Sequence, residues 1–164
     1  MPEAAPDRSS RVTLREVKRE NLRDILRLKV SPAQERLVAP NAVSIAQAHF
    51  HPEAWFRAIY AGETPVGFAM LEDWTQHPEE APEDWLREPY VALWRFMIDA
   101  RYQSLGFGAQ AMAALIAQAR SRGARVMLLS FVPGPGSPED FYRRLGFVAT
   151  GELSEGEHVM RLVL

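Results

Sequence analysis

The sequence contains no cysteine, and this absence removes several kinds of chemistry at once. Disulfides, thiolate metal sites and a cysteine nucleophile are excluded, so a thioester can be bound by this chain but not formed on a protein thiol. The histidines lack metal-ligand spacing, and no G-x-S-x-G elbow of a serine hydrolase is present. We therefore expect no metal site and no hydrolase nucleophile. The four histidines are His49, His51, His77 and His158.

Long apolar runs are also missing. No stretch approaches the roughly 20 residues that a membrane-spanning helix needs, and residues 1–7 lack the basic and apolar regions of a signal peptide. Charge of one sign is not in excess either, because 19 basic and 21 acidic residues leave a net charge of −2. The basic residues are scattered rather than gathered into a patch for nucleic acid. These absences predict a cytoplasmic protein that binds neither a membrane nor nucleic acid.

The composition is that of one globular domain, with 164 residues of which 47% are apolar. Residues 1–10 are polar and contain prolines, so we expect a flexible tail before a single domain over residues 11–164. Hydrophobic periodicity predicts the order β-α-α-β-β-β-α-β-α-β-β, an α/β (α+β) fold in which a mixed sheet has helices on both faces. The predicted strands are 11–17, 55–60, 66–71, 90–98, 126–132, 147–150 and 158–164. The predicted helices begin near residues 20, 44, 109 and 138 and end before Pro32, Pro52, Gly123 and Gly146.

The most informative segment is a glycine-containing turn at residues 103–109, between a predicted strand and a predicted amphipathic helix. Gly106 and Gly108 lack the Cβ atoms that hinder close approach to the backbone. The first N–H groups of the following helix have no intrahelical acceptor and carry positive partial charge. This corner therefore favours a bound phosphate. Because the turn has no lysine, it does not match the Walker pattern, and a pyrophosphate held by backbone donors fits better.

The residues of the turn also permit two other interpretations. Residues 106–111 also fit the loose dinucleotide fingerprint G-x-G-x-x-A, but the turn lies past the midpoint of the chain. The acidic residue that should follow about 20 positions later is absent, since residues 128–131 contain no carboxylate. A structural helix-entry turn that holds no ligand is the remaining alternative.

Two motifs on the expected elements carry a resemblance to a known family. Gln103-x-x-Gly106-x-Gly108 after the fourth strand, together with residues 141–147 near the end, resembles the GNAT superfamily of acetyl-CoA-dependent N-acetyltransferases over about residues 11–164. The resemblance implies a mostly antiparallel sheet of six to seven strands in which one parallel pair splays apart. Further segments look like those of bacterial spermine/spermidine acetyltransferases, which implies a polyamine substrate and a homodimer. These segments are residues 34–41, 44–48, 95–99 and 150–152.

The resemblance also implies where acetyl-CoA binds. The backbone of the fourth strand would pair with the pantetheine arm as a substitute strand, the turn amides would hold the pyrophosphate, and Arg101 would add positive charge. One position departs from the family pattern: Pro135 stands where an Asn is frequent, which leaves one polar contact to the pantetheine in doubt. The implied cofactor-binding residues are Phe96, Met97, Ile98, Arg101, Gln103, Ser104, Leu105, Gly106, Phe107, Gly108, Ala109 and Tyr142.

By its position in the second motif, Tyr142 is the candidate general acid. A departing CoA thiolate needs a proton, and a tyrosine with an ordinary pKa of about 10 carries one at neutral pH. The alternative is that Tyr142 is a half-buried core aromatic with its hydroxyl at the surface. A backbone N–H of the fourth strand, at Phe96 or a neighbour, is expected to polarise the thioester carbonyl.

The general base is harder to assign. Polyamine acetyltransferases of other branches place a Glu on the fourth strand, but the corresponding position here is Trp94. Glu72, Asp73 and Glu35 are the candidates, each acting through water, and each has the alternative of being a plain surface acid. Loss of the ammonium proton to solvent before binding is a further alternative. The candidate catalytic residues are therefore Tyr142, Glu72 and Glu35.

Substrate selection is expected to involve residues 72–88, which contain seven acidic residues against the single Arg87. A local acidic field raises the concentration of polycations near a cleft, and Trp74 and Trp85 can pack against methylene spacers or an ammonium group. A plain solvated loop is the alternative. Two other functions stay open: acetylation of a protein N-terminus or an aminoglycoside-like amine, and an acyl-CoA sensor without turnover.

Overall fold

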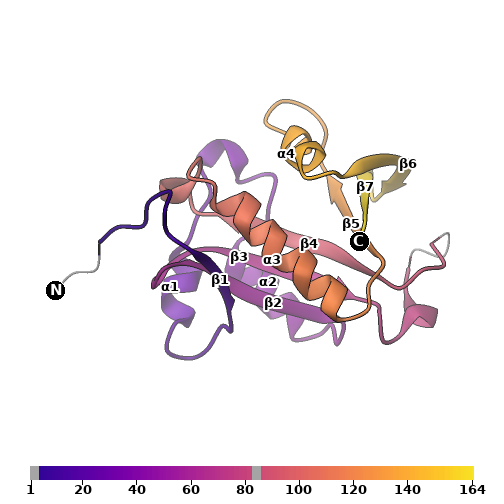
Figure 1. Ribbon diagram of the computed structural model, residues 1–164, viewed down its shortest axis with the longest axis horizontal. Coiled ribbons are helices and arrows are strands. Elements are labelled where there is room, and N and C mark those ends of the chain that lie inside the picture. Colours follow the sequence, from indigo (N-terminus) through magenta and orange to yellow (C-terminus); the bar gives the residue numbers. More distant parts are fainter. Residues whose placement is uncertain (1–3, 83–85) are drawn as a thin grey trace.

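The computed structural model describes residues 4–82 and 86–164, and its centre is a seven-stranded sheet in the order β1-β2-β3-β4-β5-β7-β6 (Figure 1). Neighbouring strands are antiparallel except β4 and β5, which are parallel. The mixed, mostly antiparallel sheet expected from the sequence is confirmed. The strands are β1 (Val12–Arg15), β2 (Ala54–Ala61), β3 (Thr64–Asp73), β4 (Tyr90–Ile98), β5 (Val126–Phe131), β6 (Val148–Ser154) and β7 (Glu157–Val163).

Helices cover both faces of the sheet, as expected. The longest, α3, lies across one face and buries Met112 and Leu115 there, while α1 and α2 lie behind the sheet in the same view (Figure 1). Among the described residues no helix has the length and apolar character to cross a membrane. The α-helices are α1 (Leu22–Arg27), α2 (Asn41–Ala48), α3 (Phe107–Ser121) and α4 (Glu139–Arg144), and short 3-10 turns form η1 (Pro32–Gln34), η2 (Pro78–Glu80) and η3 (Ala100–Tyr102).

Helix boundaries differ from the sequence-based expectation where tertiary contacts or prolines decide them. α1 ends at Arg27, well before Pro32, because the backbone becomes extended at Leu28. The next residue contacts the chain just after β4, where the Lys29 N–H donates to the Asp99 carboxylate at 2.9 Å. α2 begins at Asn41, directly after Pro40, rather than near residue 44. α3 begins at Phe107, two residues before the expected start, with Gly106 as its N-cap.

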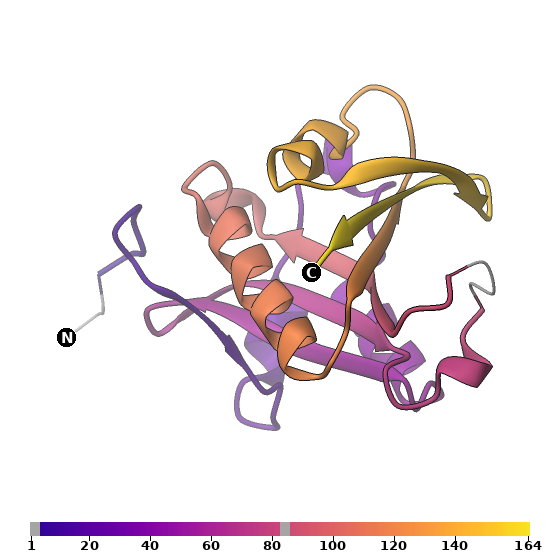
Figure 2. The same ribbon diagram turned by 45° about the vertical axis from the view of Figure 1, so that its right-hand side comes forward.

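The parallel pair separates halfway along its length. β4 and β5 pair only from Tyr90 opposite Val126 to Leu93 opposite Leu129. Beyond that point β4 continues beside β3, whereas the end of β5 pairs with β7. Trp94 is the extra residue of a β-bulge, because Arg95 pairs with Met70 and Leu93 pairs with Leu71, and a bulge bends its strand. Figure 2 shows β4 and β5 diverging. The splayed parallel pair is confirmed.

Candidate active site

A cavity of about 1420 Å³ opens where β4 and β5 separate. Side chains from both faces of the sheet line it, because the strand ladder is interrupted there. The turn before α3 and residues of α4 line it from one face, and residues of α2, β3 and β7 line it from the other. Two reactants can therefore meet in this cavity from opposite sides of the sheet.

The start of α3 presents backbone donors that have no acceptor among the described residues, and Gly108 and Ala109 line the cavity. The first backbone bond of the helix runs from the Gln110 N–H to the Gly106 carbonyl, so the three amides before Gln110 lie outside the helical ladder. Gly106 has a φ of 88° and Ser104 has a φ of 64°, both left-handed, which turns the chain sharply into α3. These amides lie at the positive end of a 15-residue helix. The geometry fits a pyrophosphate.

The two glycines of the turn serve different purposes. Gly106 is required by its positive φ, and a Cβ there would meet no atom within 4 Å. Gly108 has an ordinary backbone conformation, and a Cβ there would lie 3.4 Å from Cζ of Phe141, which is ordinary contact. Both Gly108 and Phe141 line the cavity. The missing Cβ of Gly108 therefore leaves room for a ligand rather than relieving a clash within the protein.

Nine of the twelve expected cofactor-binding residues line the cavity, and Leu105, Phe107 and Arg101 do not. Leu105 and Phe107 pack into the core and can offer only their amides. Arg101 does not line this cavity: its Nε donates to the Asp99 carboxylate at 2.8 Å, beside a separate hollow next to α1. The structure therefore does not place Arg101 where the resemblance implied it. The expected cofactor-binding residues that do line the cavity are Phe96, Met97, Ile98, Gln103, Ser104, Gly106, Gly108, Ala109 and Tyr142.

One edge of β4 is left open toward the cavity beyond Leu93. Residues from Arg95 to Ile98 pair with β3 on their other edge, while β5 has already left. Main-chain groups on such an edge need partners, and the amide-containing pantetheine arm can supply them as an added strand. Gln103 secures the corner, because its Nε2 donates to the Ile98 carbonyl and to Gln34 Oε1, both at 2.9 Å.

Tyr142 is buried rather than half-buried, and it lies between the core and the cavity. Its ring belongs to the core on the α3 face, packed edge-on against Phe141 at 5.2 Å and Phe147 at 5.7 Å between ring centroids, and only 7% of the residue is exposed. It also lines the cavity. Burial raises the pKa of Tyr142 above its ordinary value of 10.0, so the hydroxyl remains a proton-bearing donor at neutral pH.

Two arginines that the sequence analysis did not single out lie at the same cavity. Arg144, in the last turn of α4, lines it, and so does Arg36 from the segment after η1. Both are exposed, and both can add positive charge for a phosphate-bearing ligand. Arg36 also donates to the Pro135 carbonyl at 2.9 Å. Nothing local marks either position, since only the folded chain brings these segments together.

On the opposite face, Arg95 lines the cavity. Its Nη1 donates to the Trp94 carbonyl and its Nη2 to Gln47 Oε1, both at 3.0 Å, and the guanidinium lies 5.4 Å from the Trp94 ring centre. Its Nε is buried without a hydrogen-bond partner among the described residues. Burial lowers the pKa of Arg95, and the negative charges of Glu157 and Glu72 act against that shift.

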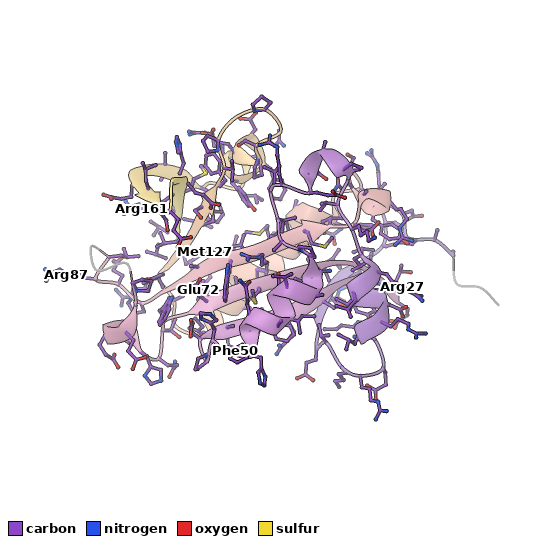
Figure 3. The ribbon with its side chains drawn as sticks, turned by 180° about the vertical axis from the view of Figure 1, so that it is seen from behind. Arg27, Phe50, Glu72, Arg87, Met127 and Arg161 are labelled. Carbon is purple, nitrogen blue, oxygen red and sulfur yellow. The ribbon has the colours of Figure 1, made fainter. Side chains whose placement is uncertain are left out.

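Glu72 and Glu157 line the cavity beside Arg95. Glu72, at the end of β3, accepts a hydrogen bond from the indole Nε1 of Trp74 at 3.1 Å, and Figure 3 shows it on the face that α1 and α2 cover. Glu157, the first residue of β7, accepts from the Ser130 hydroxyl at 2.6 Å. Sequence analysis missed Glu157, because a single acid in a terminal hairpin shows its position only once β7 lies beside β5.

The other candidate bases take different places. Glu35 is exposed and lines the cavity from the segment after η1. Asp73 does not line it: its carboxylate accepts from Arg122 and from the Thr75 hydroxyl, both at 2.6 Å. Burial acts to raise the pKa of Asp73, but these hydrogen bonds outweigh it and the pKa is lowered. Glu72 and Glu35 therefore remain at the cavity, and Asp73 is held elsewhere.

Little of the described part of the acidic segment at residues 72–88 reaches the cavity. Of its described acids, Glu72 lines the cavity, whereas Glu79 and Glu80 are exposed on η2 beside His77. Trp74 packs against a small core cluster rather than lining the cavity. Glu83, Asp84 and Trp85 lie outside the described residues.

The chain was also compared with known proteins. Residues 19–147 match the family described as Acetyltransferase (GNAT) family. An acetyltransferase from Thermus thermophilus has 18% sequence identity and a TM-score of 0.68, with 94% of this chain and 97% of that chain covered. The PaiA N-acetyltransferase of Thermoplasma acidophilum, solved in complex with coenzyme A, has 14% identity and a TM-score of 0.64, with 93% and 99% covered. No curated protein matches the sequence significantly.

The family match spans well over half of the chain, and the fold agrees with it. The protein therefore belongs to the GNAT acetyltransferase family. It is an acetyl-CoA-dependent N-acetyltransferase with acetyl-CoA as co-substrate. The open edge of β4 and the amides before Gln110 fit that co-substrate. The closer similarity to spermine/spermidine acetyltransferases is not confirmed by these comparisons.

Proposed function

We propose that the protein transfers the acetyl group of acetyl-CoA to a primary amine of a polyamine, such as spermidine or spermine, with Tyr142 as general acid. The observation that carries this proposal is the cavity through the split sheet. Tyr142 lines it from the α3 face, while Glu72 and Glu157 line it from the opposite face. The thioester would lie between them, with the Tyr142 phenol toward the α3 face. The amine would approach from the opposite face, which we call the acceptor side.

The reaction needs no covalent intermediate on the protein. A neutral amine attacks the thioester carbonyl, a carbon–nitrogen bond forms, and the carbon–sulfur bond then breaks. A backbone N–H on the open edge of β4 would polarise the carbonyl oxygen. The Tyr142 hydroxyl would donate toward the departing sulfur. Because burial raises the pKa of Tyr142, its hydroxyl first donates a hydrogen bond to the developing thiolate and then transfers the proton to the sulfur. Solvent afterwards returns a proton to the tyrosine.

The amine must also lose a proton. Glu72 is our proposed base, acting through water, because it is half-buried and lies on the acceptor side of the cavity. Glu35 is the second candidate, and its exposure at the cavity suits a relay to solvent. Trp94, at the position where other branches carry a Glu, packs by its ring against His51 at 5.0 Å and can supply no base.

Charge on the acceptor side supports a cationic substrate. Among the residues that the structure describes, the half-buried charged ones that line the cavity are Glu72, Glu157 and Arg95, two carboxylates against one guanidinium. Acids of the segment 72–88 add a field outside the cavity. If that field steers the substrate, the apparent KM for a polyamine rises with ionic strength.

Release of free CoA thiol from acetyl-CoA, measured with one amine at a time, tests the proposal. Spermidine, spermine, a peptide with a free N-terminus and an aminoglycoside make a suitable panel. Polyamine-dependent release supports the proposal. Release with the peptide alone would identify a protein N-terminal acetyltransferase, and tight CoA binding without release with any amine would identify an acyl-CoA sensor. A cytoplasmic location and a homodimer stay predictions, and light scattering after size exclusion tests the second.

A further inference from the structure

Residues 34–40, from the end of η1 to the residue before α2, form a continuous wall of the cavity. Every residue of this segment lines the cavity. Val38 packs against the core cluster beneath α1 and α2, so the segment lies on the acceptor side. We call residues 34–40 the acceptor strap. Because the strap bounds the space in which an amine would bind, its position affects how tightly an amine binds.

One side-chain hydrogen bond fixes the start of the acceptor strap. The Oε1 of Gln34 accepts from the Nε2 of Gln103 at 2.9 Å, between residues 69 positions apart in the sequence. The same Nε2 donates to the Ile98 carbonyl, also at 2.9 Å. A primary amide carries two N–H groups, so both hydrogens of the Gln103 amide have an acceptor. The strap is thereby joined to the end of β4 and to the residue that begins the glycine turn.

Gln103 leads directly into the turn that fits a pyrophosphate. Ser104 and Gly106 follow it with left-handed φ, and the amides at the start of α3 have no acceptor among the described residues. A bound pyrophosphate supplies acceptors for these amides. It binds best to the arrangement in which the amides converge, and a ligand shifts a chain toward the arrangement that it binds best. The cofactor would therefore keep Gln103 where its amide donates to Gln34.

We propose that Gln34 is a positioning residue for the amine, and that its hydrogen bond with Gln103 makes the cofactor and the amine strengthen each other's binding. This deepens the proposed function and rests on it. The cofactor at the turn fixes Gln103, Gln103 fixes Gln34, and Gln34 fixes the acceptor strap. Because coupling between two binding sites is reciprocal, the amine raises cofactor affinity by the same factor.

Arg36 gives the acceptor strap a second attachment, but its removal does not isolate the coupling. Its guanidinium donates to the Pro135 carbonyl and also places a positive charge at the cavity. Arg36→Ala therefore changes the electrostatics that both ligands meet. Gln34 and Gln103 are neutral, so replacing either by leucine removes their hydrogen bond and leaves the charge of the cavity unchanged.

Two alternative roles of Gln34 make different predictions. Gln34 lines the cavity, so a direct contact with the amine is one alternative. Such a contact changes amine affinity equally with and without the cofactor. The other alternative is capping of η1, because Gln34 Oε1 also accepts from the Ser31 N–H at 3.3 Å and from the Ser31 hydroxyl at 3.1 Å. Ser31→Ala weakens this cap and leaves the bond between Gln34 and Gln103 in place.

Calorimetric titration with spermidine tests the proposal. The measured quantity is the Kd of spermidine without CoA divided by its Kd with saturating CoA, which has the pyrophosphate but no acetyl group to transfer. Gln34→Leu and Gln103→Leu should each lower this ratio by about fivefold, the factor that one net hydrogen bond provides. The double variant should lower it no further, because both changes remove the same bond. Direct attraction between CoA and spermidine contributes equally in all these proteins, so the fall in the ratio measures the bond.

Three further variants serve as controls. Gln34→Glu keeps an acceptor oxygen for Gln103 and should keep the ratio within about twofold of that of the natural protein. Ser31→Ala should keep it as well. Gln118→Leu changes a glutamine of α3 that does not line the cavity and should have no effect on the ratio. CoA binding by each variant, measured in the same titrations, shows that the variant is folded.

Several outcomes overturn the inference. If Gln34→Leu raises the Kd of spermidine equally with and without CoA, Gln34 contacts the amine directly. A fall of the ratio in Ser31→Ala as large as that in Gln34→Leu would assign the effect to the cap of η1. If the natural protein binds CoA but binds no spermidine under either condition, the proposed function itself fails. Spermidine binding with the same ratio in all proteins defeats only the coupling.

Discussion

The guanidinium of Arg36, which lines the cavity, donates a hydrogen bond of 2.9 Å to the carbonyl oxygen of Pro135. Arg36 follows η1, and Pro135 lies in the turn between β5 and α4, so the bond joins two segments 99 positions apart in the sequence. Gly134 and Gly136, on either side of Pro135, both have positive φ. The hydrogen bond therefore connects the loop before α2 to the turn between β5 and α4, and Gly136 of that turn lines the cavity.

Arg36→Ala should weaken acetyl-CoA binding by removing this bond and a positive charge at the cavity. A single hydrogen bond contributes about 1 kcal/mol, so we expect the Kd to rise by about fivefold. Calorimetric titration with acetyl-CoA measures the change, and Arg23→Ala on α1 serves as the matched exposed-arginine control. An unchanged Kd in Arg36→Ala would show that the contact between the loops does not help to retain the cofactor.

Asp99 is the acceptor of a hydrogen-bond network that includes Arg101. The Asp99 carboxylate is buried, and it accepts from the Lys29 N–H, from the Arg101 N–H and from the Arg101 guanidinium. Burial acts to raise its pKa, but these bonds outweigh burial and lower it. Asp99→Asn should therefore lower the free energy of unfolding by about 2 kcal/mol at pH 7.

The pH dependence follows from the direction of that shift. Because the pKa of Asp99 is lower in the folded state than its unfolded value of 3.8, its contribution is full above about pH 4 and is lost as pH falls through the folded pKa. Urea unfolding at several pH values should show that the free energies of unfolding of the natural protein and of Asp99→Asn become equal at low pH.

Arg101→Gln should leave acetyl-CoA affinity unchanged, because Arg101 does not line the cavity. A large loss of affinity would show that Arg101 does help to bind acetyl-CoA.

The sequence predicted those parts of the site that depend on neighbours along the chain. The turn before α3 was recognisable because Gly106 needs its left-handed φ and because the amphipathic period of α3 follows at once. Arg95 and Glu157 could not be found this way. The bulge at Trp94 depends on the register of β3 against β4, and Glu157 reaches the cavity only through the pairing of β7 with β5. Arg101 bonds the Asp99 carboxylate and does not line the cavity, and this partner choice depends on the burial of Asp99 in the folded chain.

The two glycines of the turn should respond differently to alanine. Gly106→Ala forces a Cβ into a φ of 88° and should lower the free energy of unfolding by about 1 kcal/mol. Gly108→Ala meets only ordinary contact with Phe141 and should keep stability within about 0.5 kcal/mol. Its added methyl group lies at the cavity wall, so acetyl-CoA affinity should fall. Thermal unfolding with and without acetyl-CoA measures both effects, and equal behaviour of the two variants would contradict the distinction drawn between them.

Tyr142→Phe provides the sharpest test of the chemistry, because it removes the hydroxyl and keeps the ring that packs between Phe141 and Phe147. Loss of a general acid should lower kcat by about a hundredfold or more, while the Kd for acetyl-CoA and the melting temperature stay close to those of the natural protein. Burial raises the pKa of Tyr142 above 10.0, so its hydroxyl should remain protonated and cause no fall in kcat up to about pH 10. Steady-state kinetics from about pH 6 to about pH 10 on both proteins decide the matter. An undiminished kcat in Tyr142→Phe would reduce Tyr142 to a packing residue.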